Sequence, residues 1–299
     1  MSWYEALLQR AEAAYVRGDT ETAVDLFEEA ERRALAEGDQ DRSDRAYCNR
    51  STILIDLERG SECIPRLKQI LLRSRDDLTR WMASYATAMA SYMASDLDIA
   101  RAYARRARDL AASLADSVRI AATTNLQGNV AMLTSEFEEA EWAYEQALLT
   151  YDGRDGHDGL MAAQIRDNLG YVHLCTDRLA SGIQLCDQAR SEMETLGAEH
   201  YLQQPLQDLC YGYLLSNDLE TARECGEQSF ALAVEIDDRL VVKNCLFLLA
   251  EIAVRQDDRF RARRFLSELA HYYPELAISD ELIDVFMDMD LTRVVNLRG

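Results

Sequence analysis

Asn125–Leu149, NLQGNVAMLTSEFEEAEWAYEQALL, reads as two helices joined by a short turn. Gly128 lies on the first of these helices, and Ala140 begins the second one twelve residues later. Small residues at this offset let two antiparallel helices approach closely, because no bulky side chain separates their backbones. Phe137 and Tyr144 are then placed to fill the space between neighbouring hairpins. The stretch predicts a helical hairpin in which Gly128 tolerates no side chain.

The same spacing of small residues recurs along the chain. A small residue begins each predicted second helix at intervals of 37 to 42 residues: Ala23, Cys63, Ala100, Ala140, Gly182, Ala222 and Ala262. We call these residues the anchors. The residue twelve positions before each anchor is also small: Ala11, Ser51, Ala88, Gly128, Gly170, Cys210 and Ala250. A third row, seven positions after each anchor, is looser because Ile70 and Leu269 are large. The phased rows predict seven hairpins with one close contact each.

The composition favours helices throughout. The chain has only 3 Pro and 13 Gly among its 299 residues, and it is rich in Ala, Leu, Glu, Arg and Gln, which are good helix formers. No segment shows the apolar–polar alternation and Asn-Gly or Asp-Gly turns of a β-hairpin. Asp, Ser, Asn or Thr occupies each turn before a second helix, and we expect these residues to cap that helix. The sequence predicts an all-α protein.

These features resemble the tetratricopeptide repeat (TPR) family, whose unit is a helix–turn–helix of about 34 residues. The segments FEEAEWAYEQAL and NLGYVHL of the fourth and fifth units carry the resemblance most clearly, and it covers roughly residues 3 to 272. The longer period, near 40, is similar to that of kinesin light chain and of bacterial sensors, namely the peptide-pheromone receptors and the maltotriose-sensing activator. The resemblance implies a right-handed α-α superhelix of about seven units.

The expected solenoid covers residues 1–274, and residues 275–299 are expected to form a capping helix and a tail. A solenoid exposes apolar surface at its final repeat, so a helix near residues 279–290 is well placed to cover it. We expect the tail, residues 291–299, to be loose. The approximate units are 3–37, 41–74, 77–114, 117–151, 158–196, 199–236 and 239–273.

Charge and cysteine usage narrow the class of partner and the compartment. The formal net charge of −21 opposes nucleic acid as the primary ligand and disfavours an anionic membrane surface. No apolar run approaches the ~20 residues that cross a bilayer. The seven cysteines form no Cys-x-x-Cys pair, and the first residues already form an amphipathic helix in place of a signal peptide. These features favour a cytoplasmic protein with free thiols.

The sequence holds no motif for catalysis, a cofactor or a metal. Its four histidines are scattered over different units, and no phosphate-binding loop, His-Glu-x-x-His or Rossmann fingerprint occurs. The link Tyr151–Gly159 is rich in Gly and Asp, which suggests either a calcium site or a plain linker. It lacks the Asp-x-Asp-x-Asp-Gly spacing of an EF-hand, so we favour the linker. We expect a non-enzyme without cofactor or metal.

The family resemblance implies a concave groove lined by the first helices, with ligand contacts at 18, 15, 11 and 8 residues before each anchor. In the third unit these positions form a stripe of Met and Tyr, side chains that suit peptide docking. In later units carboxamides are frequent, and an amide side chain can grip a peptide backbone because it donates and accepts at once. The expected groove residues are Met82, Tyr85, Met89, Tyr92, Met93, Asn125, Asn129, Gln164, Asp167, Asn168, Tyr171, Gln207 and Tyr211.

Two alternatives stay open for these residues and for the function. In a tightly wound superhelix the Met and Tyr stripe is core instead of groove, and part of the carboxamide row is structural. We expect a non-catalytic scaffold or adaptor that binds a peptide segment of another protein. The alternative is a regulatory sensor that responds to a ligand or peptide and acts through a partner protein. The sequence leaves the partner and the oligomeric state open.

Overall fold

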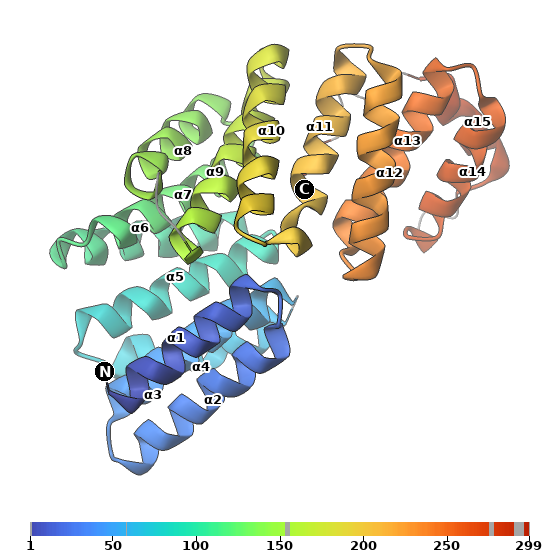
Figure 1. Cartoon of the computed structure of the whole chain (residues 1–299). Coiled ribbons are helices and arrows are strands. Elements are labelled where there is room, and N and C mark those ends of the chain that lie inside the picture. The colour runs from blue at the N-terminus through green and yellow to red at the C-terminus, as the bar shows by residue number, and fades with distance from the viewer. Residues whose placement is uncertain (1, 58, 153–155, 275–277, 290–295, 299) are drawn as a thin grey trace. The chain divides into compact units, whose positions relative to one another are not determined.

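The computed structural model describes residues 2–57, 59–152, 156–274, 278–289 and 296–298, and within these residues it contains helices and no strand (Figure 1). The predicted all-α class is therefore confirmed. The chain divides into two compact units, Met1–Ile165 and Arg166–Gly299, and each is described by itself.

The first unit is a stack of antiparallel helical hairpins. From α1 to α8 each helix contacts the next one along the chain, and α3 contacts α5 as α5 contacts α7. The first helices of successive hairpins therefore form one layer, which we call the inner wall of the unit. The helices are α1 (Trp3–Val16), α2 (Thr20–Ala36), α3 (Gln40–Asp56), α4 (Gly60–Arg73), α5 (Asp77–Met93), α6 (Leu97–Ser113), α7 (Ser117–Leu133), α8 (Phe137–Tyr151) and the start of α9 (Gly156–Cys175).

The second unit repeats this arrangement. α11 contacts its hairpin partner α12 and also α13, the first helix of the next hairpin. α11 and α13 therefore belong to the inner wall of the second unit, together with the later part of α9. In this unit α10 and α12 are the second helices of their hairpins. Its further helices are α10 (Leu179–Thr195), the short 3₁₀ helix η1 (Glu199–Tyr201), α11 (Gln203–Leu215), α12 (Leu219–Glu235), α13 (Arg239–Arg255), α14 (Arg259–Ala270) and α15 (Asp280–Met287).

The two rows of small residues are the close contacts inside each hairpin, as the spacing predicts. All seven anchors and all seven residues twelve positions earlier are buried. The contact is tightest in the α9–α10 hairpin, where a Cβ on Gly170 would lie 2.5 Å from Sγ of Cys186 and 3.1 Å from the Cys186 backbone nitrogen. Real Cβ atoms do not approach other atoms so closely, so the hairpin requires glycine there.

The turns use a left-handed residue followed by the residue that caps the next helix. Asn217 has φ 63°, and the backbone N–H of Asp218 donates to the carbonyl of Tyr213, which closes α11. The Asp218 carboxylate then accepts from the backbone N–H of Thr221 and caps α12. Our expectation that every second helix has such a cap is wrong for α4, α6, α8 and α10, which show no side-chain cap. At α8 and α10 the small polar residue falls on the left-handed position, so Glu136 or Arg178 occupies the cap.

The final helix covers the end of the last hairpin, as predicted. α15 contacts α13 and α14, and Ile283 and Met287 are buried against Ala253 and Ala262. Of the expected cap and tail region, residues 275–277, 290–295 and 299 lie outside the described residues. So do residues 153–155 of the Gly- and Asp-rich link, which leaves our interpretation of that link untested.

Candidate functional site

Three residues near the C-terminal end of the chain lie on the inner wall of the second unit. We call Asn296, Leu297 and Arg298 the tail segment. Leu297 is 1% exposed and the Arg298 side chain is 10% exposed, so the expectation of a loose tail is wrong for these residues. The side chains that receive the segment, which we call the tail site, are Asp167 and Tyr171 on α9, Gln207 and Asp208 on α11, and Asn244 on α13.

Both backbone polar groups of Leu297 are held by side chains. The N–H of Leu297 donates to the hydroxyl oxygen of Tyr171 at 3.0 Å. Its carbonyl accepts from Nδ2 of Asn244 at 2.7 Å, and the same nitrogen donates to Oε1 of Gln207 at 2.9 Å. Both hydrogen bonds are made to main-chain atoms of Leu297. Side chains of α9 and α13 therefore grip one residue of peptide from two sides.

The guanidinium of Arg298 is the cation of the site. Its Nη2 atom lies 3.3 Å from Oδ2 of Asp167 and also donates to Oδ2 of Asp208. The guanidinium carbon lies 4.7 Å from the centroid of the Tyr171 ring, which is the geometry of a cation–π contact. Two buried carboxylates on different helices thus converge on one arginine that also stacks on an aromatic ring.

Burial sets the electrostatics of the two carboxylates. Burial raises the pKa of Asp208 well above its usual value, the charge of Asp167 adds to this rise, and Arg298 opposes it. The pKa of Asp167 is likewise raised by burial, and Arg298 again lowers it. With a single guanidinium between two acids, the ionised pair keeps one surplus negative charge. The site therefore favours an additional positive charge or a proton.

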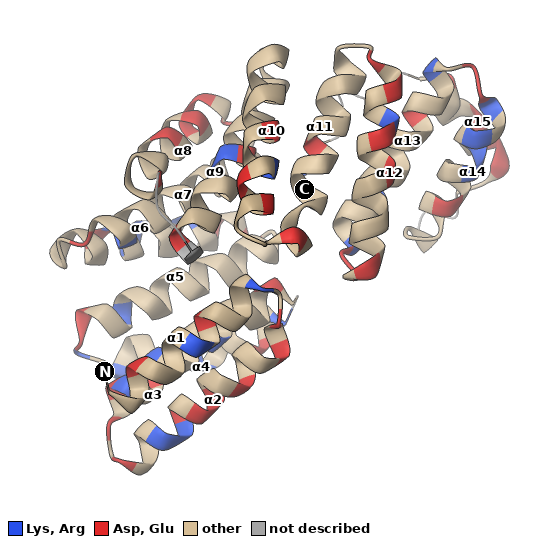
Figure 2. Cartoon of the chain, viewed as in Figure 1, with Lys and Arg blue, Asp and Glu red and all other residues tan. Residues whose placement is uncertain are grey.

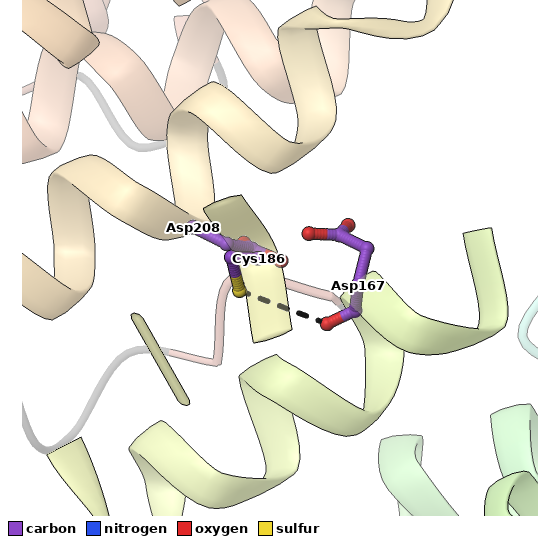
Figure 3. Close-up of side chains that lie close together, drawn as sticks. All are labelled: Asp167, Cys186 and Asp208. Carbon is purple, nitrogen blue, oxygen red and sulfur yellow. Dashed lines mark hydrogen bonds between the residues drawn. The ribbon is translucent and has the colours of Figure 1, made fainter. Parts of the chain in front are cut away.

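Cys186 on α10 completes a cluster that resembles a metal site in composition. One ligand atom from each of Asp167, Cys186 and Asp208 lies within 4.8 Å of the others, and Figure 3 shows the three side chains together. However, the Cys186 thiol donates to the carbonyl of Asp167 at 3.9 Å, and burial raises its pKa well above the usual value. A metal ligand would have to be the thiolate. Arg298 supplies the positive charge between the carboxylates, so we assign the cluster to arginine.

The predicted stripe of the third unit is neither fully exposed nor fully buried. Met82, Tyr85, Met89 and Tyr92 are half-buried on α5, and each packs against buried residues of the first unit. Met93 is 50% exposed. The Tyr85 ring stacks on Trp81 with centroids 5.3 Å apart. These side chains share their surface between the core and solvent, which is compatible with either alternative.

The fourth-unit carboxamides differ from each other. Oδ1 of Asn129 accepts a hydrogen bond from the hydroxyl of Tyr144 at 2.9 Å, which ties it to the hairpin contact. Asn125 is buried, and its Oδ1 has no hydrogen-bond partner among the described residues. Gln164, also in the first unit, is half-buried. These three residues do not converge on one point as the tail site does.

Four of the predicted residues come together in the second unit. The tail segment contacts Asp167 and Tyr171 directly, and Gln207 accepts a hydrogen bond from Asn244, which also holds the segment. The centroids of the Tyr211 and Tyr171 rings lie 6.0 Å apart. Asn168 is half-buried on the same helix as Asp167. The structure thus gathers at one place residues that the sequence predicts only as members of a long row.

Sequence reasoning missed Asp208 and Asn244. Asn244 lies 18 residues before the anchor Ala262, so the family's groove offsets identify it once they are applied to the seventh unit. Asp208 lies 14 residues before Ala222, the offset that Asn168 has from Gly182. That signal was weaker, because acidic residues occur on nearly every helix of this chain (Figure 2).

Comparisons with known proteins establish the fold. No family model and no curated protein matches the chain. NprR in complex with its cognate peptide NprX matches with a TM-score of 0.68 and 11% identity, over 91% of this chain and 78% of that one. A Rap protein complexed with Competence and Sporulation Factor matches with a TM-score of 0.63 and 18% identity, over 92% and 76%.

A third similar solved structure contains a tetratricopeptide repeat sensor. It is the signal transduction ATPase PH0952 from Pyrococcus horikoshii, which has a tetratricopeptide repeat sensor; the TM-score is 0.56 and the identity 16%, over 95% of this chain and 44% of that one. Within the described residues, no helix combines the length and apolarity needed to span a bilayer. The protein described here therefore has the TPR-like helical-repeat fold, as its sequence predicts.

Proposed function

We propose that this protein is a non-catalytic binding module that holds an extended peptide segment of another protein on its inner walls. The observation that carries the proposal is the clamp on Leu297, in which Tyr171 and Asn244 bond both backbone polar groups of one residue. Such a clamp binds any peptide main chain of suitable shape. The clamp also buries polar side chains, and burying a polar group costs free energy unless it is hydrogen-bonded. A wall that only packs helices together does not need such side chains.

The fold supports a peptide as the ligand class. Two solved structures with the same fold are complexes, one with a cognate peptide and one with Competence and Sporulation Factor. The first unit offers a different surface, the half-buried Met and Tyr stripe of α5, for apolar side chains of a bound segment. We propose peptide docking for that stripe on its side-chain chemistry alone.

A peptide-responsive sensor is the second candidate, and the tail segment favours it. A ligand that binds the tail site must first displace Leu297 and Arg298, which releases the tail segment from the inner wall. A ligand shifts an equilibrium only by its differential affinity for the two states, and a competing internal segment supplies such a difference. The sensor would then act through a partner protein that binds the displaced segment.

Fluorescence anisotropy with two labelled hexapeptides tests the proposal. One is VVNLRG, the sequence of residues 294–299, and the other is VVNLQG. The receptor is the Leu297→Ala/Arg298→Ala variant, whose own tail segment is weakened. We expect both probes to bind, and Asn244→Ala in this receptor to weaken both by about 10-fold, the effect of one lost hydrogen bond.

Gln228→Ala serves as the matched control, because Gln228 is exposed on α12, outside the inner wall. It should leave both affinities unchanged. Failure of both probes to bind at millimolar concentration, or binding that is indifferent to Asn244→Ala, would refute the proposed function.

A further inference from the structure

We propose that the Asp167–Asp208 pocket selects an arginine-bearing segment, and that the tail segment is its built-in occupant, which such a partner segment must displace. This inference rests on the proposed function and adds the chemistry of the ligand. The partner segment carries an apolar residue followed by arginine, in an extended conformation.

The charges of the pocket require a cation. Asp208 is fully buried and Asp167 nearly so, and both carboxylates face the single guanidinium of Arg298. Buried charges are retained only where they are paired, because water cannot solvate them there. An occupant without positive charge would leave two acids without a cation, so an uncharged side chain binds at this position more weakly than arginine.

The geometry selects arginine over lysine. The bound group must reach carboxylates on α9 and α11 and also lie against the Tyr171 ring, with 4.7 Å from its carbon to the ring centroid. A planar guanidinium presents several N–H groups in a fixed fork and stacks well on aromatic faces. A lysine ammonium is a compact, strongly hydrated point charge, and it matches this arrangement less well.

The tail segment fills the pocket incompletely. One nitrogen, Nη2 of Arg298, serves both Asp167 and Asp208, whereas Oδ1 of Asp167 receives no N–H donor from the described residues although it is buried. An arginine that approached Asp167 with two parallel N–H groups would also satisfy this oxygen. Bidentate pairs of this kind are stronger than single contacts. The site thus leaves room for a partner arginine to bind better than Arg298.

The preceding residue supplies the second recognition element. Leu297 is 1% exposed, so a segment in this site buries one large apolar side chain beside its clamped backbone. The covalent link gives the tail segment a high effective concentration at the site, because its binding is intramolecular. A partner peptide therefore binds measurably only when its own contacts exceed those of Arg298 and Leu297.

The probe series VVNLRG, VVNLKG and VVNLQG tests the pocket and the occupant separately. In the Leu297→Ala/Arg298→Ala receptor, VVNLRG should bind about 10-fold tighter or more than VVNLQG, with VVNLKG between them. Asp208→Asn and Asp167→Asn, each added to this receptor, should remove most of the preference. The unmodified protein should bind VVNLRG about 10-fold more weakly than the receptor variant.

The outcomes distinguish the two levels of the argument. Equal affinity for all three probes would overturn the arginine pocket while leaving peptide binding intact. Equal affinity of VVNLRG for the unmodified protein and for the receptor variant would overturn the built-in occupant. Binding of no probe would remove the proposed function itself. If either Asn variant fails to fold by circular dichroism, the probe series in the unaltered pocket still decides.

Discussion

Arg298→Ala is expected to lower the free energy of unfolding of the 166–299 unit by about 3 kcal/mol at pH 8, the cost of breaking a buried ion pair from one side. The loss should be much smaller at pH 4. Arg298 contacts two buried carboxylates, Asp167 and Asp208, and its removal leaves them without their cation. Urea denaturation followed by circular dichroism at both pH values measures the difference.

The sign of the pH dependence follows from the raised pKa values. Burial raises the pKa of Asp167 and of Asp208 above the unfolded value of about 3.9, and Arg298 opposes both shifts. A group with a raised folded-state pKa contributes its stability below the unfolded pKa, and this contribution is lost as pH rises through the folded pKa. Without Arg298 both pKa values rise further, so the loss at high pH deepens.

Arg223→Ala is the matched control for this prediction. Arg223 pairs with the exposed acids Glu220 and Glu227 on α12, so its removal should cost no more than about 1 kcal/mol at either pH. An equal effect of Arg298→Ala at pH 4 and pH 8 would show that Arg298 contributes packing alone.

Gly170→Leu is expected to destabilise the second unit by about 3 kcal/mol or more, at the upper end of the usual cost of overpacking a core. Its Cβ would lie 2.5 Å from Sγ of Cys186, and 3.1 Å from both the Cys186 backbone nitrogen and the Gly182 carbonyl oxygen. Backbone atoms cannot rotate away, so α9 and α10 must separate. The measurement is the midpoint of thermal and urea unfolding.

Ala180→Leu provides the comparison, because Ala180 is exposed on α10 and tolerates the same side chain. It should leave the unfolding midpoint nearly unchanged. Gly128→Leu should also destabilise its hairpin, but less, since the nearest atoms there belong to the Tyr144 ring at 2.8 Å and the Ala143 side chain. A stable Gly170→Leu protein would contradict the close packing of α9 on α10.

The helical repeat could be predicted because its cause is local and periodic. A small residue such as Ala23 or Cys210 has to recur wherever two helices touch, and the same requirement holds in every hairpin. Whether a position requires glycine, in contrast, depends on which atoms of the partner helix face it. Gly128 and Gly170 have the same position in the repeat. A Cβ on Gly170 would meet backbone atoms of its partner helix at 3.1 Å as well as Sγ of Cys186, whereas the nearest atoms to a Cβ on Gly128 all belong to side chains.

The tail site could be predicted only in part. Asp167, Tyr171 and Gln207 follow from the groove offsets, and Asn244 follows once the offsets are extended to the last hairpin. Nothing periodic links Arg298 to these residues, because the contact with Asp167 joins positions 131 residues apart in the chain. A contact of this kind has no local signature. The sequence of the tail therefore does not indicate that this segment occupies the site.

Hydrogen exchange at the backbone amide of Leu297, followed by NMR, tests most directly whether the inner wall of the second unit grips a peptide main chain. The N–H of Leu297 donates to the Tyr171 hydroxyl, and the residue is buried. We predict exchange slowed by about 100-fold or more relative to an unstructured chain, and loss of most of this protection in Tyr171→Phe. Exchange of the Leu297 amide at the rate of an unstructured chain in the unmodified protein would contradict the account.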